Sequence, residues 1–253
     1  MLLQYWDQVF SQGVAFHDSL NQLSLMFSPD SLLDLDRTEH RVIFDNVSHA
    51  WEALAKISNY LQFRLKPGIY GKVIGKPFIS GAVFIGQGTV IEHGAMIKGP
   101  AWIGEGCEIR NGAYIRENVV VGNGVVLGNS CEFKNCLIFD EAQIPHFNYV
   151  GDSILGHKAH LGAGAILSNV RLDHTPVHVT ASTGTVSTGL KKFGAIIGDR
   201  AEIGCNSVLS PGSIIGRDSI IYPGTSWRGV LPENSIAKEI PQSLKIIPRQ
   251  RRD

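Results

Sequence analysis

Charge is scarce in this sequence and carries no net sign. Only 18% of the 253 residues are charged, and 23 lysines and arginines balance 23 aspartates and glutamates. A chain without net charge lacks the positive field that draws proteins to nucleic acid or to anionic membranes. The composition therefore argues against a nucleic-acid partner and against a protein of the membrane surface.

Long apolar runs and a cysteine framework are also missing. No segment approaches the roughly 18 apolar residues of a membrane span, and the first residues lack a basic stretch followed by an apolar one. The sequence has four cysteines and no CxxC pair: Cys107, Cys131, Cys136 and Cys205. Such cysteines are best read as small apolar side chains that stay reduced. We therefore expect a soluble, cytoplasmic protein.

Glycine is abundant, with 28 residues, and it accompanies a strict period of six. The residue four places after each repeated apolar position is usually small or β-branched, as at Thr89 and Ala95. The apolar positions recur at Ile85, Ile91, Ile97, Ile103, Ile109, Ile115, Val121, Leu127, Phe133 and Phe139, and again at Leu155, Leu161, Ile197, Ile203, Leu209, Ile215 and Ile221.

A period of six predicts stacked short strands. An α-helix cannot maintain it, because 3.6 residues per turn would make the apolar stripe drift around the helix. Each hexapeptide can instead form one flat side of a prism, with its apolar residue inside and a glycine or asparagine at the corner. Three sides make a coil, and coils stack about 4.8 Å apart. The predicted fold class is all-β: a parallel β-helix over residues 68–240.

The period is absent from residues 1–67, which we interpret as a small helical extension packed against or before the first coil. A tail is expected at 241–253. Asn46 or Ser48 is the predicted helix cap. The helix should run to about Leu61, and the residues expected on its apolar face are Trp51, Leu54, Ala55 and Leu61.

A second interruption falls between Leu167 and Ile196, where the chain is polar and rich in threonine and glycine. A loop of this length inside a repeat array is unusual and is more often functional than not. It is long enough to reach a neighbouring subunit.

Three motifs depart most from the plain repeat: His146-x-x-Tyr-x-Gly-Asp152, Gly162-Ala-Gly164 and Lys192-Phe-Gly-Ala195. Together they resemble the acetyltransferase half of bifunctional N-acetylglucosamine-1-phosphate uridyltransferases, over about residues 68–240. The resemblance implies a left-handed β-helix, a homotrimer, acetyl-CoA as cosubstrate and no metal requirement. It also implies acetylation of a hexosamine 1-phosphate, glucosamine 1-phosphate above all, in support of UDP-N-acetylhexosamine synthesis.

The resemblance assigns roles to individual residues. His146 is implied to be the general base. The positions implied to bind the sugar phosphate are Arg116, Lys134, Tyr149, His160 and Lys192, and those along the coenzyme are Ala163, Asn169 and Cys205. His160 and Cys205 stand where the family commonly has asparagine and serine, and no match to its late coenzyme-binding arginine is found.

The chemistry of these residues supports the roles. Acyl transfer to an amine needs a base with a pKa near neutrality, and histidine ordinarily titrates near about 6.5. A backbone N–H in the turn at residues 162–164 could stabilise the developing oxyanion. Four other histidines are interpreted as structural: His93, His157, His174 and His178.

Arg116 and Lys134 lie 18 residues apart, one full coil, and Lys98 lies 18 residues earlier. The three cations should stack on successive coils, with no acidic residue in that frame between them. A phosphate bridging Arg116 and Lys134 would explain the arrangement, whereas Lys98 is expected to extend into water.

Other activities fit the sequence less well. The 67 residues before the prism are too few for a nucleotidyltransferase domain, so this chain is not expected to make a UDP-sugar. A zinc hydratase of the γ-carbonic-anhydrase type is disfavoured, because His157-x-x-His160 does not match its ligand pattern. A non-catalytic hexapeptide module for trimerisation or sugar-phosphate sensing is the remaining alternative.

Overall fold

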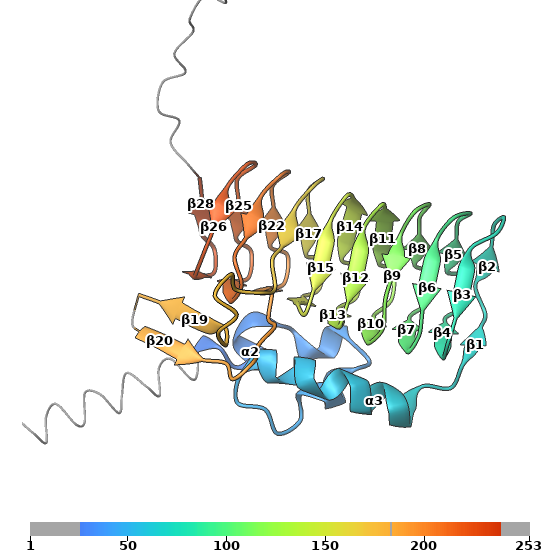
Figure 1. Ribbon diagram of the computed structural model, residues 1–253, viewed down its shortest axis with the longest axis horizontal. Coiled ribbons are helices and arrows are strands. Elements are labelled where there is room, and N and C mark those ends of the chain that lie inside the picture. The colour runs from blue at the N-terminus through green and yellow to red at the C-terminus, as the bar shows by residue number, and fades with distance from the viewer. Residues whose placement is uncertain (1–25, 183, 239–253) are drawn as a thin grey trace, which may run out of the picture.

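The computed structural model describes residues 26–182 and 184–238, and its body is a three-sided parallel β-helix (Figure 1). Sheet A contains β1 (Gly68–Ile69), β4 (Val83–Ile85), β7 (Ala101–Ile103), β10 (Val119–Val121), β13 (Cys136–Ile138), β16 (Ile154–Leu155), β21 (Ala195–Ile197), β24 (Ser213–Ile215) and β27 (Val230–Leu231).

Sheet B contains β2 (Lys72–Val73), β5 (Val90–Ile91), β8 (Glu108–Ile109), β11 (Val126–Asn129), β14 (Gln143–His146), β17 (His160–Leu161), β22 (Glu202–Ile203), β25 (Ile220–Ile221) and β28 (Ile236–Ala237). Sheet C contains β3 (Phe78–Ser80), β6 (Met96–Lys98), β9 (Tyr114–Ile115), β12 (Glu132–Lys134), β15 (Tyr149–Gly151), β18 (Ile166–Leu167), β23 (Val208–Leu209) and β26 (Ser226–Trp227).

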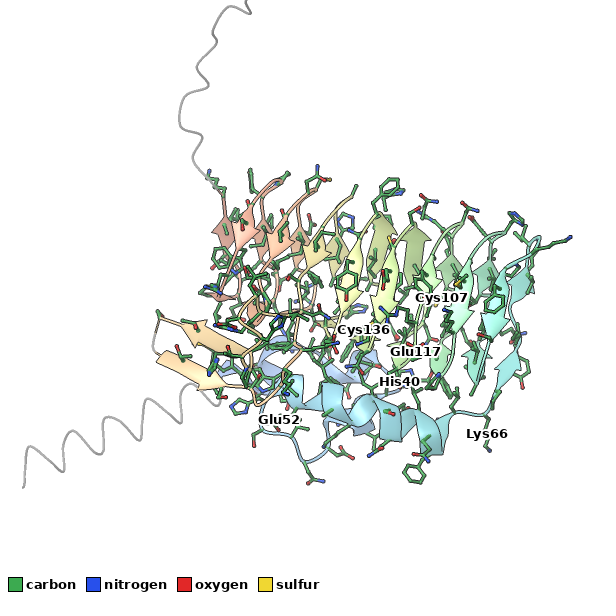
Figure 2. All side chains as sticks on the ribbon, in the orientation of Figure 1. His40, Glu52, Lys66, Cys107, Glu117 and Cys136 are labelled. Carbon is green, nitrogen blue, oxygen red and sulfur yellow. The ribbon has the colours of Figure 1, made fainter. Side chains whose placement is uncertain are left out.

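The interior of the prism is filled by the repeated apolar residues, as predicted. Ile85, Ile103 and Val121 stack in register on sheet A, 18 residues apart, and all are fully buried. The small side chains at the following corners, such as Cys107, complete the same core, to which Cys136 on β13 also belongs (Figure 2). The prediction of a parallel β-helix of hexapeptide repeats is confirmed.

One inward position was predicted wrongly. The residue that stacks on Val121 is Ile138, because the corner after Phe133 has only two residues before Cys136 and is thus one residue shorter than the corner before Val119. Phe139 therefore lies outside the prism, where it is buried with its ring centroid 5.9 Å from that of Phe44.

The N-terminal segment forms α2 (Pro29–Leu32), three 3₁₀ helices, η1 (Leu35–Arg37), η2 (Arg41–Phe44) and η3 (Ala50–Lys56), and α3 (Ile57–Arg64). These helices lie lengthwise along the outer face of sheet A (Figure 1) rather than against or before the first coil as expected. Their apolar side chains meet a continuous row on that face, which includes Trp102, Val120, Leu137, Ile154, Ile196 and Ile214. The sequence pattern concealed this second core, because these outward residues alternate with the inward ones.

The predicted helix exists but begins differently. Its first seven residues are the 3₁₀ helix η3, whose N-cap is His49 with no side-chain capping bond. The backbone N–H of Ser48 donates to Glu52 Oε2 at 2.9 Å, so neither predicted cap is used. A 3₁₀ helix repeats every three residues, which buries Ala53 beside Leu54 and leaves Ala55 exposed, contrary to the prediction.

The insertion after Leu167 contains an antiparallel hairpin, β19 (His178–Ala181) and β20 (Gly184–Ser187). Val177 and Val179 are fully buried, together with Phe193, in the second core on the outer face of sheet A. The insertion is therefore anchored to its own chain, beside the N-terminal helices (Figure 1). No helix in residues 26–182 or 184–238 has the length and apolar character needed to cross a membrane.

Candidate active site

Two edges of sheet C carry most of the residues singled out in the sequence. At the edge toward sheet A, three cations stack in register: Lys98 on β6, Arg116 directly after β9, and Lys134 on β12. The predicted column of cations is therefore confirmed as a geometric arrangement. Lys98 does not simply extend into water as expected, because its Nζ donates to the Tyr114 hydroxyl at 3.0 Å.

The column is not free of acidic neighbours. Glu132 Oε1 lies 2.8 Å from Arg116 Nη1, and Asp152 Oδ2 lies 3.7 Å from Lys134 Nζ. No acidic residue lies in the frame of the column itself, as expected, but these two acids enter from another position of β12 and from the next corner and relieve the repulsion. The hydrogen bond that Arg116 donates to Glu132 raises the pKa of Arg116, so its guanidinium stays charged.

Asp152 links this cluster, although no role was predicted for it from the sequence. Its carboxylate is nearly buried and accepts bonds from Asn135 Nδ2 at 2.9 Å and from Asn169 Nδ2 at 2.5 Å. Asn169 Nδ2 also donates to the Tyr149 hydroxyl at 3.2 Å. A signal was present, since Asp152 closes the motif that begins with His146 and buried carboxylates are usually bound to several donors.

Lys192 is held near the same network by its backbone neighbours. The N–H of Phe193 donates to the Asn169 carbonyl at 3.0 Å, and the N–H of Gly194 donates to the Asp152 carbonyl at 2.8 Å. The Lys192 side chain is exposed. Lys134, Tyr149 and Asn169 are thus brought together around Asp152, and the backbone next to Lys192 is bonded to the same network.

The opposite edge of sheet C, at the corner with sheet B, carries His146, Ala163 and Cys205 on successive coils. The Gly164 N–H donates to the His146 carbonyl at 3.0 Å, and the Asn206 N–H donates to the Ala163 carbonyl at 2.8 Å. The His146 and Cys205 side chains are exposed. A molecule lying along this corner would meet all three residues.

The turn at residues 162–164 offers one backbone donor rather than three. The N–H of Gly162 donates to the Ile203 carbonyl at 2.7 Å, and that of Gly164 is bonded to His146. In the described part of the chain, the Ala163 N–H has no backbone or side-chain acceptor. It is therefore the donor of this turn that remains available to an oxyanion.

Asn148 fixes the corner that presents His146. It is buried in the prism, where other coils have a small apolar residue, and its Oδ1 accepts from the His146 N–H at 3.2 Å. Its Nδ2 donates to the Gly162 carbonyl at 2.7 Å. The bonds tie the His146 corner to the turn above it. The signal in the sequence is an amide at an inward repeat position, where a small apolar residue is expected.

Two predicted site residues lie apart from their expected groups. His160 lies on sheet B, where it pairs with Gln143 and Glu202, and it is half-buried. Asn169, expected along the coenzyme with Ala163 and Cys205, lies in the network of Asp152 instead.

His157, interpreted as structural, is buried, and its Nδ1 lies 2.9 Å from the Asp140 carbonyl. Within the two described ranges, no group of three or more histidine, cysteine, aspartate or glutamate side chains is arranged to hold a metal ion.

Comparison with known proteins places this geometry in a family. A family model described as "GMPPB C-terminal domain" matches residues 97–247, more than half of the chain. The chain belongs to this family. The "Bifunctional protein GlmU" of Methanococcus maripaludis is 38% identical over 187 residues, which cover 74% of this chain and 45% of that protein. The chain thus spans less than half the length of that relative.

A relative of more similar length is a "Putative uncharacterized acetyltransferase YaiX" of Escherichia coli, 37% identical over 187 residues that cover 70% of this chain and 81% of that protein. A solved structure, the acetyltransferase domain of PglB from Neisseria gonorrhoeae in complex with acetyl coenzyme A, matches at 15% identity. The match covers 73% of this chain and 60% of that one, with a TM-score of 0.31. The sequence relatives confirm the resemblance to sugar-phosphate acetyltransferase domains.

Proposed function

We propose that this chain is an acyltransferase that moves the acetyl group of acetyl-CoA to the amine of a hexosamine 1-phosphate, with glucosamine 1-phosphate as the preferred substrate. The observation that carries the proposal is the pair of clusters on one face of sheet C. An exposed histidine lies at one edge, and a cationic cluster lies at the other. The three-residue strand β15 between them spans roughly 10 Å, which suits a sugar whose amine and phosphate point to opposite edges.

In this proposal the reaction needs only groups on this chain and the two substrates. The amine nitrogen attacks the thioester carbonyl carbon while His146 accepts the proton that the amine loses. The Ala163 N–H donates to the oxygen as it becomes negative. The carbon–sulfur bond then breaks, the amide forms, and the coenzyme leaves as a thiol after taking a proton from the protonated His146.

The names of the relatives support acetyl transfer and a sugar 1-phosphate. The methanococcal relative is called bifunctional, and a similar protein of Sulfurisphaera tokodaii is named a "Bifunctional sugar-1-phosphate nucleotidylyltransferase/acetyltransferase". The product of this chain would be an N-acetylhexosamine 1-phosphate, which a uridylyltransferase could consume.

Product analysis tests the proposed function. Purified chain should convert glucosamine 1-phosphate and acetyl-CoA into an N-acetylated sugar phosphate, identified by mass spectrometry and NMR. Binding of the sugar phosphate without any acetylated product would favour the non-catalytic sensing module instead.

The phosphate clamp should appear as a change in KM. Replacing Arg116 or Lys134 with alanine should raise the KM for the sugar phosphate roughly ten- to hundredfold, since a bond to a charged group contributes about 1.5–3 kcal/mol. The KM for acetyl-CoA should not change. Lys98→Ala removes a cation from the same column and is the matched control. Unchanged sugar-phosphate KM in both variants would refute the clamp.

Asp152 is expected to act as a positioning residue. Asp152→Asn keeps the size of the side chain but removes the charge beside Lys134 and places an N–H₂ group among its donors. The KM for the sugar phosphate should rise roughly tenfold, while the KM for acetyl-CoA stays the same.

The control for this change is Asp218→Asn, which breaks an exposed pair with Arg200 at 2.6 Å. A loss of thermal stability in Asp152→Asn with no change in sugar-phosphate KM would leave Asp152 with a structural role only.

The active form is proposed to be a homotrimer with sites between prisms. The N-terminal helices cover sheet A, so other copies must approach sheets B and C. Several apolar side chains are exposed on sheet C: Phe78 by 54%, Met96 by 38% and Val208 by 42%. A neighbour could exclude water from the exposed His146. Light scattering should give the mass of three chains, and a stable, active monomer would contradict this assembly.

A further inference from the structure

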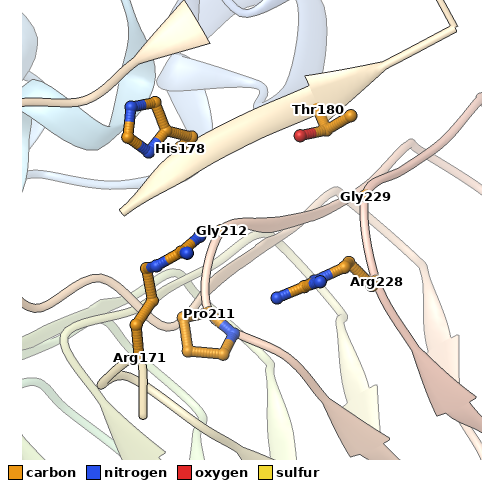
Figure 3. Close-up of a pocket in the computed structure, with 7 residues that line it drawn as sticks. All are labelled: Arg171, His178, Thr180, Pro211, Gly212, Arg228 and Gly229. Atoms are coloured by element: carbon orange, nitrogen blue, oxygen red, sulfur yellow. The ribbon is translucent and has the colours of Figure 1, made fainter. Parts of the chain in front are cut away.

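A cavity of about 310 Å³ lies where the inserted hairpin meets the last coils (Figure 3). It is separate from the clusters described above. Its lining residues are Arg171, His178, Thr180, Pro211, Gly212, Arg228 and Gly229. Its volume falls at the lower end of the range typical of small-molecule pockets.

Two glycines allow the hairpin to form one wall of this cavity. A Cβ on Gly212 would lie 2.4 Å from the His178 carbonyl oxygen, and one on Gly229 would lie 2.9 Å from the Thr180 carbonyl oxygen. Both glycines have positive φ, +84° and +93°. Strand β19 therefore lies directly on the corners of the last coils, which only glycine permits at this distance.

Basic side chains dominate the cavity. Figure 3 shows Arg171 and Arg228 extending into it from opposite sides, with His178 on the hairpin above. Arg171 uses Nε and Nη2 to bind Asp173, at 3.0 and 2.6 Å, which leaves Nη1 free of that pair. Arg228 is exposed and has no hydrogen bond or ion pair to any residue of the described ranges.

We propose that this cavity binds the phosphoryl group of a phosphate ester. Two guanidinium groups that converge from opposite walls offer planar sets of N–H donors, which match the oxygens of a phosphoryl group. His178 and the Thr180 hydroxyl supply further polar contacts. The inserted hairpin would then serve to enclose the site, because without it the two arginines would lie on an open surface.

This site is distinct from the proposed phosphate clamp. Along the same edge of sheet C, Lys134 pairs with Gly151, and the following coils place Ser168, Ser210 and Arg228 in register. Four coil steps separate Lys134 from Arg228, a backbone distance of roughly 19 Å. One phosphate cannot contact both arginine sites, so the cavity takes a second phosphoryl group. The inference does not depend on the proposed acetyl transfer.

Calorimetric titration of the full chain with inorganic pyrophosphate tests the site. The titration uses a background carrying Arg116→Gln and Lys134→Gln, which leaves this cavity as the predicted anion site. We expect one pyrophosphate per chain. Adding Arg228→Gln or Arg171→Gln should weaken the binding at least tenfold, whereas Arg200→Gln, which removes an arginine paired with Asp218 elsewhere, should not.

Two further ligands identify the source of the phosphoryl group. Binding of adenosine 3′,5′-bisphosphate that is lost in Arg228→Gln would identify the phosphorylated end of the coenzyme. Binding of glucosamine 1-phosphate lost in the same variant would identify a second sugar phosphate. The proposal is overturned if the background chain binds no pyrophosphate, or if both cavity variants bind all three ligands as the background chain does.

Discussion

Replacing His146 with alanine should lower kcat roughly 10²–10⁴-fold, the range expected when a general base is removed. The side chain is exposed at the corner of sheets B and C, and it makes no hydrogen bond to the described residues through its ring, so the fold should be unaffected. Acetyl-CoA should bind the variant as well as the parent, because Ala163 and Cys205 remain. Steady-state kinetics and a coenzyme titration measure both effects.

His93 provides a matched control. It occupies the same corner of the prism three coils earlier, is also exposed, and accepts a bond at Nδ1 from the Lys76 N–H at 3.1 Å. His93→Ala should keep the parental kcat. Full activity of His146→Ala would show that the base has been assigned wrongly.

Replacing Trp51 with alanine should lower the free energy of unfolding by about 3–5 kcal/mol, the usual cost of a large aromatic removed from a core. Trp51 is 1% exposed and packs between Phe27 and Phe193, with ring centroids 5.5 and 6.0 Å away. Because Phe193 directly follows Lys192, the loss of the Trp51 ring should also disturb Lys192, which is expected to bind the sugar phosphate. Urea unfolding gives the stability, and the KM for sugar phosphate reports the disturbance.

Phe63→Ala is the control for this prediction. Phe63 lies on α3 and is 88% exposed, so its removal should change the stability by no more than about 0.5 kcal/mol. A Trp51 variant as stable as the Phe63 variant would mean that the N-terminal helices do not stabilise the β-helix.

The β-helix could be predicted from the sequence because its period is local. Each inward residue from Ile85 to Phe133 lies six positions after the previous one. Few folds other than a β-helix have sides of six residues. The one-residue shift that brings Ile138 into the prism could not be predicted from the sequence. A glycine or asparagine is compatible with a corner of two residues and with a corner of three. Counting strictly by six then assigned Phe139 to the wrong face.

The candidate site was predictable only where motifs mark it. The motifs pointed to His146, Tyr149 and Ala163 as candidates, but they did not point to the partners that orient them. Asn148 and Asp152 act through bonds to carbonyls and amides on neighbouring coils, which are distant in sequence. The place of the N-terminal helices was hidden for the same reason, because the outward row on sheet A is recognisable only when the coils are stacked.

The rate of coenzyme thiol release tests the central claim most directly. With acetyl-CoA in excess, the parent chain should release thiol with glucosamine 1-phosphate at a rate well above that with glucose 1-phosphate, which lacks the amine, or with glucosamine, which lacks the phosphate. His146→Ala should abolish the difference. Thiol release that is no faster with glucosamine 1-phosphate than with either analogue would contradict acetyl transfer to a hexosamine 1-phosphate.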